Sequence, residues 1–242
     1  MKICVVQSRS IKGDIPGNIG HHKQMVQLAV VNAAEMVIFP ELSVTNYEPT
    51  LAKELATAKS DDRFNELQAM SDSEKVTIGI GVPTKNPEGI YITMVILQPN
   101  KPRETYSKKY LHVDEEPFFV SGKSSVTQLG EKRDIALAIC YELSVPAHSE
   151  DAYRNGAKIY LVSVAKTANG MVKAMDTLSG IAIKYHMQVL ISNAVGEADG
   201  DKMGGRSAVM NQEGVLLAQL DDSSEGILIY DTVTEDVLAK TL

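Results

Sequence analysis

The sequence has no tryptophan, only two cysteines and no uninterrupted apolar segment long enough to cross a membrane. Two cysteines and no recognisable export signal argue against a disulfide framework. The formal net charge is −7, whereas a nucleic-acid partner would favour a basic surface. We therefore expect a cytoplasmic protein that binds neither a membrane nor a nucleic acid.

The chain nevertheless contains enough apolar side chains for a large core, since 44% of its 242 residues are hydrophobic. Short apolar runs alternate with segments of helical period, and no repeat or linker divides them. We predict one domain over residues 1–242, of the α/β class. Its architecture is expected to be a four-layer α-β-β-α sandwich, with two mixed β-sheets face to face and helices outside. A helix is expected over 51–70 and an antiparallel sheet edge over 76–106.

The segment 133–146 contains the residue around which we expect the chemistry to be organised. Residues 135–139 form a short apolar run without helical period, as in a strand that is buried on both faces. Cys140 follows directly, and Pro146 favours the start of a helix soon afterwards. A strand-to-helix turn presents a side chain at the edge of a sheet beside free backbone N–H groups, where a nucleophile is useful. Taken alone, Cys140 is more simply explained as a small buried apolar residue, the commoner fate of a free cysteine.

Glu41 is a second polar residue at the end of a predicted strand. The apolar run 36–39 is followed by Pro40 and Glu41, and catalytic groups in α/β sheets collect at the carboxyl ends of strands. The segment 107–122 mixes charges of both signs with aromatic residues and has no period, so we predict an irregular loop with a function. The alternative is that these charges are solvated surface groups.

Three short motifs resemble those of the nitrilase, or carbon–nitrogen hydrolase, superfamily. They are a glutamate motif over 37–47, a lysine motif over 106–111 and a cysteine motif over 139–142. Each is weak by itself, but their order and spacing together are specific, and supporting matches extend over nearly the whole chain. The resemblance implies a single carbon–nitrogen hydrolase domain over residues 1–242. It also favours the amidase-like branch, because Tyr141 stands where many true nitrilases have a tryptophan.

The resemblance implies a role for each residue of a catalytic triad. Cys140 would be the nucleophile, Glu41 the general base, and Lys108 the cation that stabilises the tetrahedral intermediate. We prefer Lys108 to Lys109 because the lysine of the family lies three residues before a leucine, here Leu111.

Further positions would serve the substrate and the oxyanion. A second glutamate, which positions the substrate in the family, is assigned to Glu115, with Glu116 as the alternative. The backbone N–H of Tyr141 is expected to share the charge of the oxyanion, and Tyr47 to contact the substrate.

General chemistry supports the same roles independently of the resemblance to the family. A cysteine with a pKa of about 8.5 is mostly thiol at neutral pH, so a carboxylate is needed to take its proton. A nearby lysine lowers the thiol pKa. Attack by sulfur, loss of ammonia or an amine, and attack by water make a thioester route that needs neither a metal nor a cofactor.

The substrate and the partner are less constrained. Family amidases often have an arginine four residues after the cysteine, which can pair with a substrate carboxylate; here it is Ser144. We predict a small-molecule amide as substrate, with a carbamoyl amide, a nitrile, a non-catalytic binding role or a redox-sensing thiol as alternatives. The family implies a homodimer, which here would rest on helices because the chain stops at Leu242. Polar pocket candidates, each equally well explained as solvated, are Tyr47, His112, Ser163, Lys166 and Arg206.

Overall fold

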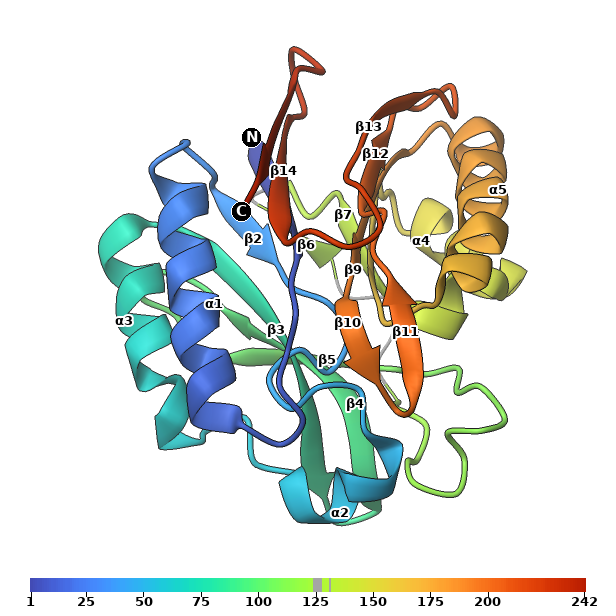
Figure 1. Cartoon of the computed structure of the whole chain (residues 1–242). Helices are drawn as coiled ribbons and strands as arrows, with labels where there is room; N and C mark the ends of the chain where they lie inside the picture. The colour runs from blue at the N-terminus through green and yellow to red at the C-terminus, as the bar shows by residue number, and fades with distance from the viewer. Residues whose placement is uncertain (124–127, 131) are drawn as a thin grey trace.

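Two mixed β-sheets pack face to face, and each carries helices on its outer face (Figure 1). The computed structural model describes residues 1–123, 128–130 and 132–242. The first sheet has the spatial order β15 (Val237–Thr241), β14 (Gly226–Asp231), β1 (Lys2–Gln7), β2 (Met36–Ile38), β3 (Thr77–Asn86), β4 (Gly89–Leu97) and β5 (Glu104–Ser107). The second has the order β13 (Leu216–Gln219), β12 (Ala208–Met210), β9 (Gln188–Asn193), β8 (Ile159–Val164), β7 (Ile135–Ile139) and β6 (Gln128–Leu129).

The helices form the outer layers. α1 (Ile15–Val30) and α3 (Asn65–Glu74) pack on the first sheet, and α4 (Pro146–Arg154) and α5 (Ala168–Tyr185) pack on the second. The predicted four-layer sandwich is therefore confirmed. Within the described residues, no helix is long and apolar enough to cross a membrane.

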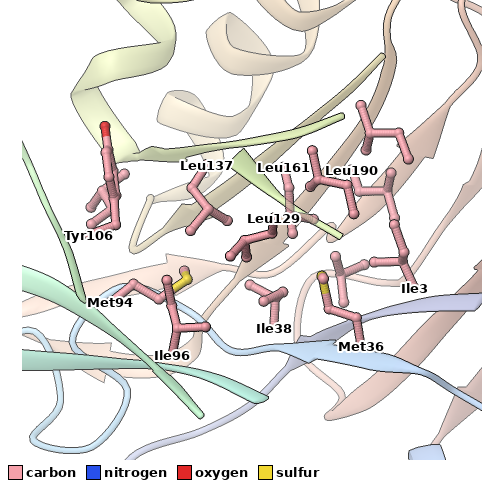
Figure 2. Packing of buried hydrophobic residues seen from close by; sticks show 14 of the residues in the cluster. Ile3, Met36, Ile38, Met94, Ile96, Tyr106, Leu129, Leu137, Leu161 and Leu190 are labelled. Atoms are coloured by element: carbon pink, nitrogen blue, oxygen red, sulfur yellow. The ribbon is translucent and has the colours of Figure 1, made fainter. Parts of the chain in front are cut away.

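The inner faces of the two sheets form the central core. In β1, Ile3 and Val5 point toward the other sheet, whereas Cys4 and Val6 point toward the helices, as the alternation of side chains in a strand requires. Figure 2 shows side chains of the first sheet, such as Ile38 and Ile96, facing leucines of the second sheet. Full burial of each such side chain stabilises the fold by about 1.5–3 kcal/mol.

Hydrogen bonds between the sheets align the ends of particular strands. The Ser163 hydroxyl, in β8, donates to the Phe39 carbonyl just after β2, at 2.8 Å. The Ser192 hydroxyl, in β9, donates to the Val6 carbonyl in β1, at 2.6 Å. The carboxyl end of β2 is therefore fixed beside the carboxyl end of β8, and both ends carry polar residues.

The predicted antiparallel edge is confirmed, because β3, β4 and β5 pair antiparallel and β5 is the last strand of the sheet. The predicted helix over 51–70 is wrong. The chain forms 3₁₀ turns at Pro49–Leu51 and Asp62–Phe64 and a short α2 (Ala52–Leu55), and α3 begins only at Asn65. The helix stops because Thr57 pairs with β3: its N–H donates to the Pro83 carbonyl, and its carbonyl accepts from the Lys85 N–H.

A small hairpin, β10 (Val195–Ala198) and β11 (Asp201–Gly204), lies outside both sheets. Its apolar side chains form a separate cluster, and Tyr47 and Ala165 pack against that cluster. The hairpin therefore connects the segment after β2 with the segment after β8.

Candidate active site

The ammonium group of Lys108 lies between two carboxylates. Its Nζ is 2.8 Å from Glu41 Oε1 and 2.6 Å from Glu115 Oε1. The side chains of Lys108 and Glu41 are 0% exposed and that of Glu115 is 2% exposed. A buried lysine and carboxylates would each cost several kcal/mol if they were alone, so their charges stabilise one another.

Glu41 is held by the tight packing of its loop against β3. Leu42, the next residue, has a left-handed backbone with φ of 51°. A side chain at Gly81 would place a Cβ atom 2.3 Å from the Leu42 nitrogen, so only glycine permits this approach. The Val44 N–H also donates to the Gly81 carbonyl, at 3.0 Å.

A buried histidine supports the same loop. His22 Nδ1 lies 2.6 Å from the Asn18 carbonyl, and its Nε2 lies 2.9 Å from the Ser43 hydroxyl. The Asn18 carbonyl can only accept, so Nδ1 carries a proton, and in the neutral ring Nε2 then accepts from the Ser43 hydroxyl. The ring stacks on Phe39, with centroids 4.0 Å apart, and burial lowers the pKa of His22 to about 4.

Lys108 and Glu115 lie in the irregular segment after β5. The Lys108 N–H donates to the Ile92 carbonyl, and its carbonyl accepts from the Gly122 N–H. Glu115 Oε2 accepts from the His112 N–H at 2.8 Å, and Glu115 Oε1 accepts from the Tyr47 hydroxyl at 3.1 Å. The carboxylate of Glu115 is thus fixed from three directions. Glu116 and Lys109, the alternatives left open by the sequence, are both exposed.

Cys140 directly follows β7 and begins a 3₁₀ turn over Cys140–Ser144. Its φ of 45° lies in the left-handed region, which costs a non-glycine residue about 1–2 kcal/mol. Such strain persists where the surrounding structure fixes it, often at a functional site. Cys140 is partly exposed, whereas Cys4 is fully buried.

Burial is the main reason why Cys140 favours the thiol over the thiolate. Burial, and after it the charge of Glu41, raise the pKa of the Cys140 thiol, the charges of Lys166 and Lys108 oppose them, and the net result is a pKa of about 11. Burial also raises the pKa of the Glu41 carboxyl, which Lys108 opposes and Glu115 reinforces. For Lys108, burial lowers the pKa, but the charges of Glu41, Cys140 and Glu115 outweigh it, so the pKa is raised. The arrangement therefore has a protonated thiol beside a carboxylate of raised basicity.

Sequence reasoning assigned no role to Glu142, which the structure places at the centre of a buried network. Its Oε1 accepts from the Lys109 N–H at 2.7 Å, and its Oε2 accepts from the Ile139 N–H at 2.8 Å and the Tyr106 hydroxyl at 2.7 Å. A glutamate at the third position of a helical turn can accept from the N–H of the residue before the turn, which is one half of a capping box; the other half is missing because Ile139 has no side-chain oxygen. The position of this glutamate could have predicted the bond to Ile139, but not the bond to Lys109.

His148 extends this network. Because the Tyr106 hydroxyl donates to Glu142, its oxygen accepts from His148 Nε2, at 2.8 Å. His148 Nδ1 then accepts from the Tyr160 hydroxyl, at 2.7 Å. Burial lowers the pKa of His148 to about 4, so the ring is neutral and every ring nitrogen is bonded.

The remaining pocket candidates have different surroundings. Ser163 is buried and bonded to Phe39, and the Arg206 guanidinium lies 3.6 Å from the carboxylate of Asp222. The His112 ring contacts the ring of Tyr141 edge-on, with centroids 5.2 Å apart. Lys166 is partly exposed, and its charge acts on Cys140. Within the described residues, no group of three His, Cys, Asp or Glu side chains could hold a metal ion.

Comparison with known proteins identifies the class. The carbon-nitrogen hydrolase family matches residues 2–239 of the chain. The "Hydrolase in agr operon" of Staphylococcus aureus is 24% identical, over 98% of this chain and 93% of that protein. "Nitrilase 3" of Arabidopsis thaliana is 21% identical, over 98% of this chain and 80% of that protein.

Solved structures of an amidase from Nesterenkonia sp. AN1 have the same fold. A variant in complex with butyramide has a TM-score of 0.88 and 21% identity, covering 97% of this chain and 92% of that one. Another variant, which shows Michael addition of acrylamide at the active site cysteine, also has a TM-score of 0.88 and 21% identity, covering 97% and 94%.

The chain belongs to the carbon–nitrogen hydrolase family, the nitrilase superfamily. The protein is therefore an enzyme of the class that acts on carbon–nitrogen bonds other than peptide bonds. The resemblance predicted from the three motifs is confirmed.

Proposed function

We propose that the enzyme hydrolyses small primary amides through a thioester on Cys140, with Glu41, Lys108 and Glu115 as the other catalytic residues. The observation that carries this proposal is the fully buried ammonium of Lys108, held at hydrogen-bond distance from both carboxylates. A buried cation beside a cysteine is suited to a reaction in which a carbonyl oxygen gains negative charge. The relatedness to an amidase seen with butyramide supports an amide as substrate.

In the first half of the reaction, the Cys140 sulfur attacks the amide carbon while Glu41 takes the thiol proton. The raised pKa of Cys140 makes this proton transfer necessary, because little thiolate exists beforehand. The oxyanion would be stabilised by Lys108 Nζ and the backbone N–H of Tyr141, and one such donor is worth about 3–4 kcal/mol. Glu41 then returns the proton to the nitrogen, the carbon–nitrogen bond breaks, and ammonia leaves.

In the second half, a water molecule hydrolyses the thioester. Glu41 takes a proton from this water as the water oxygen attacks the thioester carbon, and the same donors stabilise the second oxyanion. The carbon–sulfur bond breaks, Cys140 recovers a proton, and the carboxylic acid leaves. Glu115, fixed by Tyr47 and the His112 N–H, would keep Lys108 oriented and contact the amide nitrogen.

The test is ammonia release by the purified protein across a panel of small amides, ureido acids and nitriles, with Cys140→Ala alongside. We expect ammonia from amides with wild type and none with Cys140→Ala. A preference for ureido acids would instead indicate a carbamoyl-amide hydrolase, and for nitriles a nitrilase. No release from any compound, by a protein whose Cys140 also resists alkylation, would contradict the proposal.

A further inference from the structure

Lys166 has a fixed main chain and a free ammonium group. Its N–H donates to Asn193 Oδ1 at 2.8 Å, and its carbonyl accepts from Asn193 Nδ2 at 3.0 Å and from the Gly204 N–H at 2.8 Å. Among the residues that the structure describes, none forms a hydrogen bond or an ion pair with the Lys166 ammonium. The base of this side chain is thus positioned firmly, while the described residues supply no carboxylate within ion-pair distance of its ammonium.

The fold directs this segment to the candidate site. β8 is the parallel neighbour of β7, with Ser163 opposite Ile139, so Lys166 and Cys140 both follow the same edge of the sheet. Ser163 is also bonded to the residue two positions before Glu41. Ala165 packs on the hairpin cluster that Tyr47 contacts. The charge of Lys166 reaches Cys140, because it lowers the pKa of that thiol.

The charges of the site explain why a second cation is useful. Glu41 and Glu115 supply two negative charges against the single positive charge of Lys108. The whole chain is also acidic, with a net charge of −7. A ligand with a carboxylate would be repelled by this surplus, and a partly exposed lysine without a partner can offset it.

We propose that Lys166 forms an anion-binding subsite beside Cys140, so that the enzyme selects primary amides whose acyl chain carries a carboxylate. The substrate class rests on the proposed amide hydrolysis. The carboxylate must lie on the acyl side of the substrate, because the leaving group of a primary amide is ammonia, which carries no substituent.

The first test measures alkylation of Cys140, which does not depend on amide hydrolysis. Iodoacetate and iodoacetamide attack the same thiol and differ in charge, so an effect on the thiol pKa cancels in the ratio of their rates. We expect the rate with iodoacetate divided by the rate with iodoacetamide to be higher at Cys140 than for free cysteine. It should fall about tenfold in Lys166→Met, be largely retained in Lys166→Arg, and be unchanged in Lys173→Met, an exposed control on α5.

The second test measures ammonia release from the monoamides of malonic, succinic and glutaric acid. It compares them with the same monoamides in which the free carboxylate is a methyl ester and therefore uncharged. We expect wild type to have a kcat/KM at least about tenfold higher for the best acid than for its ester, and Lys166→Met to lose that ratio while it keeps most activity on the ester. A folded Lys166→Met protein with both ratios unchanged would overturn the subsite. So would an equal loss with charged and neutral compounds, because Lys166 would then act on the thiol or oxyanion.

The two proposals fail in different ways. Wild type that hydrolyses none of these amides, yet shows a Lys166-dependent alkylation ratio, would overturn amide hydrolysis and leave the anion subsite. Wild type that hydrolyses neutral amides without any charge preference, and alkylates without one, would overturn only the subsite.

Discussion

Glu142 Oε1 accepts a hydrogen bond from the main-chain N–H of Lys109, at 2.7 Å, and thereby joins the loop that carries Lys108 to the turn that carries Cys140. The same carboxylate is bonded to the Ile139 N–H on its other oxygen. Two segments that are about thirty residues apart in sequence are therefore held in one geometry by a single buried side chain. Among the described residues, Glu142 is bonded to the main chain next to Lys108 and Cys140 and not to their side chains, so we expect it to act by positioning them.

Glu142→Gln should lower both activity and stability. Glutamine keeps one acceptor but presents an NH₂ group toward donors, so at least one buried donor loses its partner. Hydrogen bonds to a charged group contribute about 1.5–3 kcal/mol each, so we expect the free energy of unfolding to fall by about 2–4 kcal/mol. We expect kcat to fall at least tenfold with a smaller change in KM. Urea unfolding and steady-state kinetics check both.

A suitable control for this variant is Glu150→Gln, which removes the partner of Arg154 on the surface of α4. An exposed pair of this kind contributes about 0.5 kcal/mol or less. Equal effects of the two substitutions would contradict a positioning role for Glu142.

Lys108→Ala should abolish turnover, whereas Lys109→Ala should leave most of it. Removing the ammonium leaves Glu41 and Glu115 buried without a counter-charge, which we expect to cost about 3–5 kcal/mol of stability at neutral pH. The stability deficit should shrink as the pH falls, because the carboxyl groups then take up protons. Kinetics and urea unfolding of both variants test this, and a Lys109→Ala enzyme as inactive as Lys108→Ala would reject the assignment of the lysine motif.

Much of the architecture follows from local pattern. The buried run before Cys140, the run before Glu41 and the proline near the start of α4 are each visible in the sequence, and each forms the element expected. The break at Thr57 was not predictable in this way, because it depends on pairing with Pro83 and Lys85, which lie far along the chain. Local periodicity contains no information on such a contact.

The candidate site shows the same division. The sequence indicated Glu41, Lys108 and Cys140 but left Glu116 as an alternative to Glu115, since the side chains of adjacent acidic residues differ only in the direction in which they point. In the structure Glu115 contacts Lys108 and Glu116 is exposed. The contact of Glu142 with Lys109 and the surroundings of the Lys166 ammonium depend on how distant segments meet. The catalytic roles, the homodimer and the cytoplasmic location remain predictions.

Stability should fall as the pH is lowered from about 6.5 to 4. Burial lowers the pKa of both His22 and His148 to about 4, whereas in the unfolded chain a histidine has a pKa of about 6.5. Between these values the unfolded state binds more protons, so acid favours unfolding, by up to about 3 kcal/mol for each histidine. Urea unfolding at a series of pH values measures the slope.

Two histidine variants separate this effect from general acid sensitivity. His148→Gln should reduce the slope by about one proton in that range. His21→Gln should not, because the Glu225 carboxylate raises the pKa of His21. A slope that is unchanged in His148→Gln would show that His148 is not held neutral.

Glu41→Gln should make the thiolate of Cys140 easier to form and yet stop hydrolysis. The negative charge of Glu41 raises the pKa of Cys140, which is about 11, so the neutral amide should lower that pKa. The pH dependence of alkylation by iodoacetamide would then shift to lower pH in the variant. Turnover should fall at least about 10³-fold, because glutamine can neither take the thiol proton nor return it to the leaving nitrogen. Opposite changes in the two measurements would identify Glu41 as the general base. A thiol pKa that rises in Glu41→Gln would instead mean that the carboxylate stabilises the thiolate, and retained turnover would mean that another group accepts the proton.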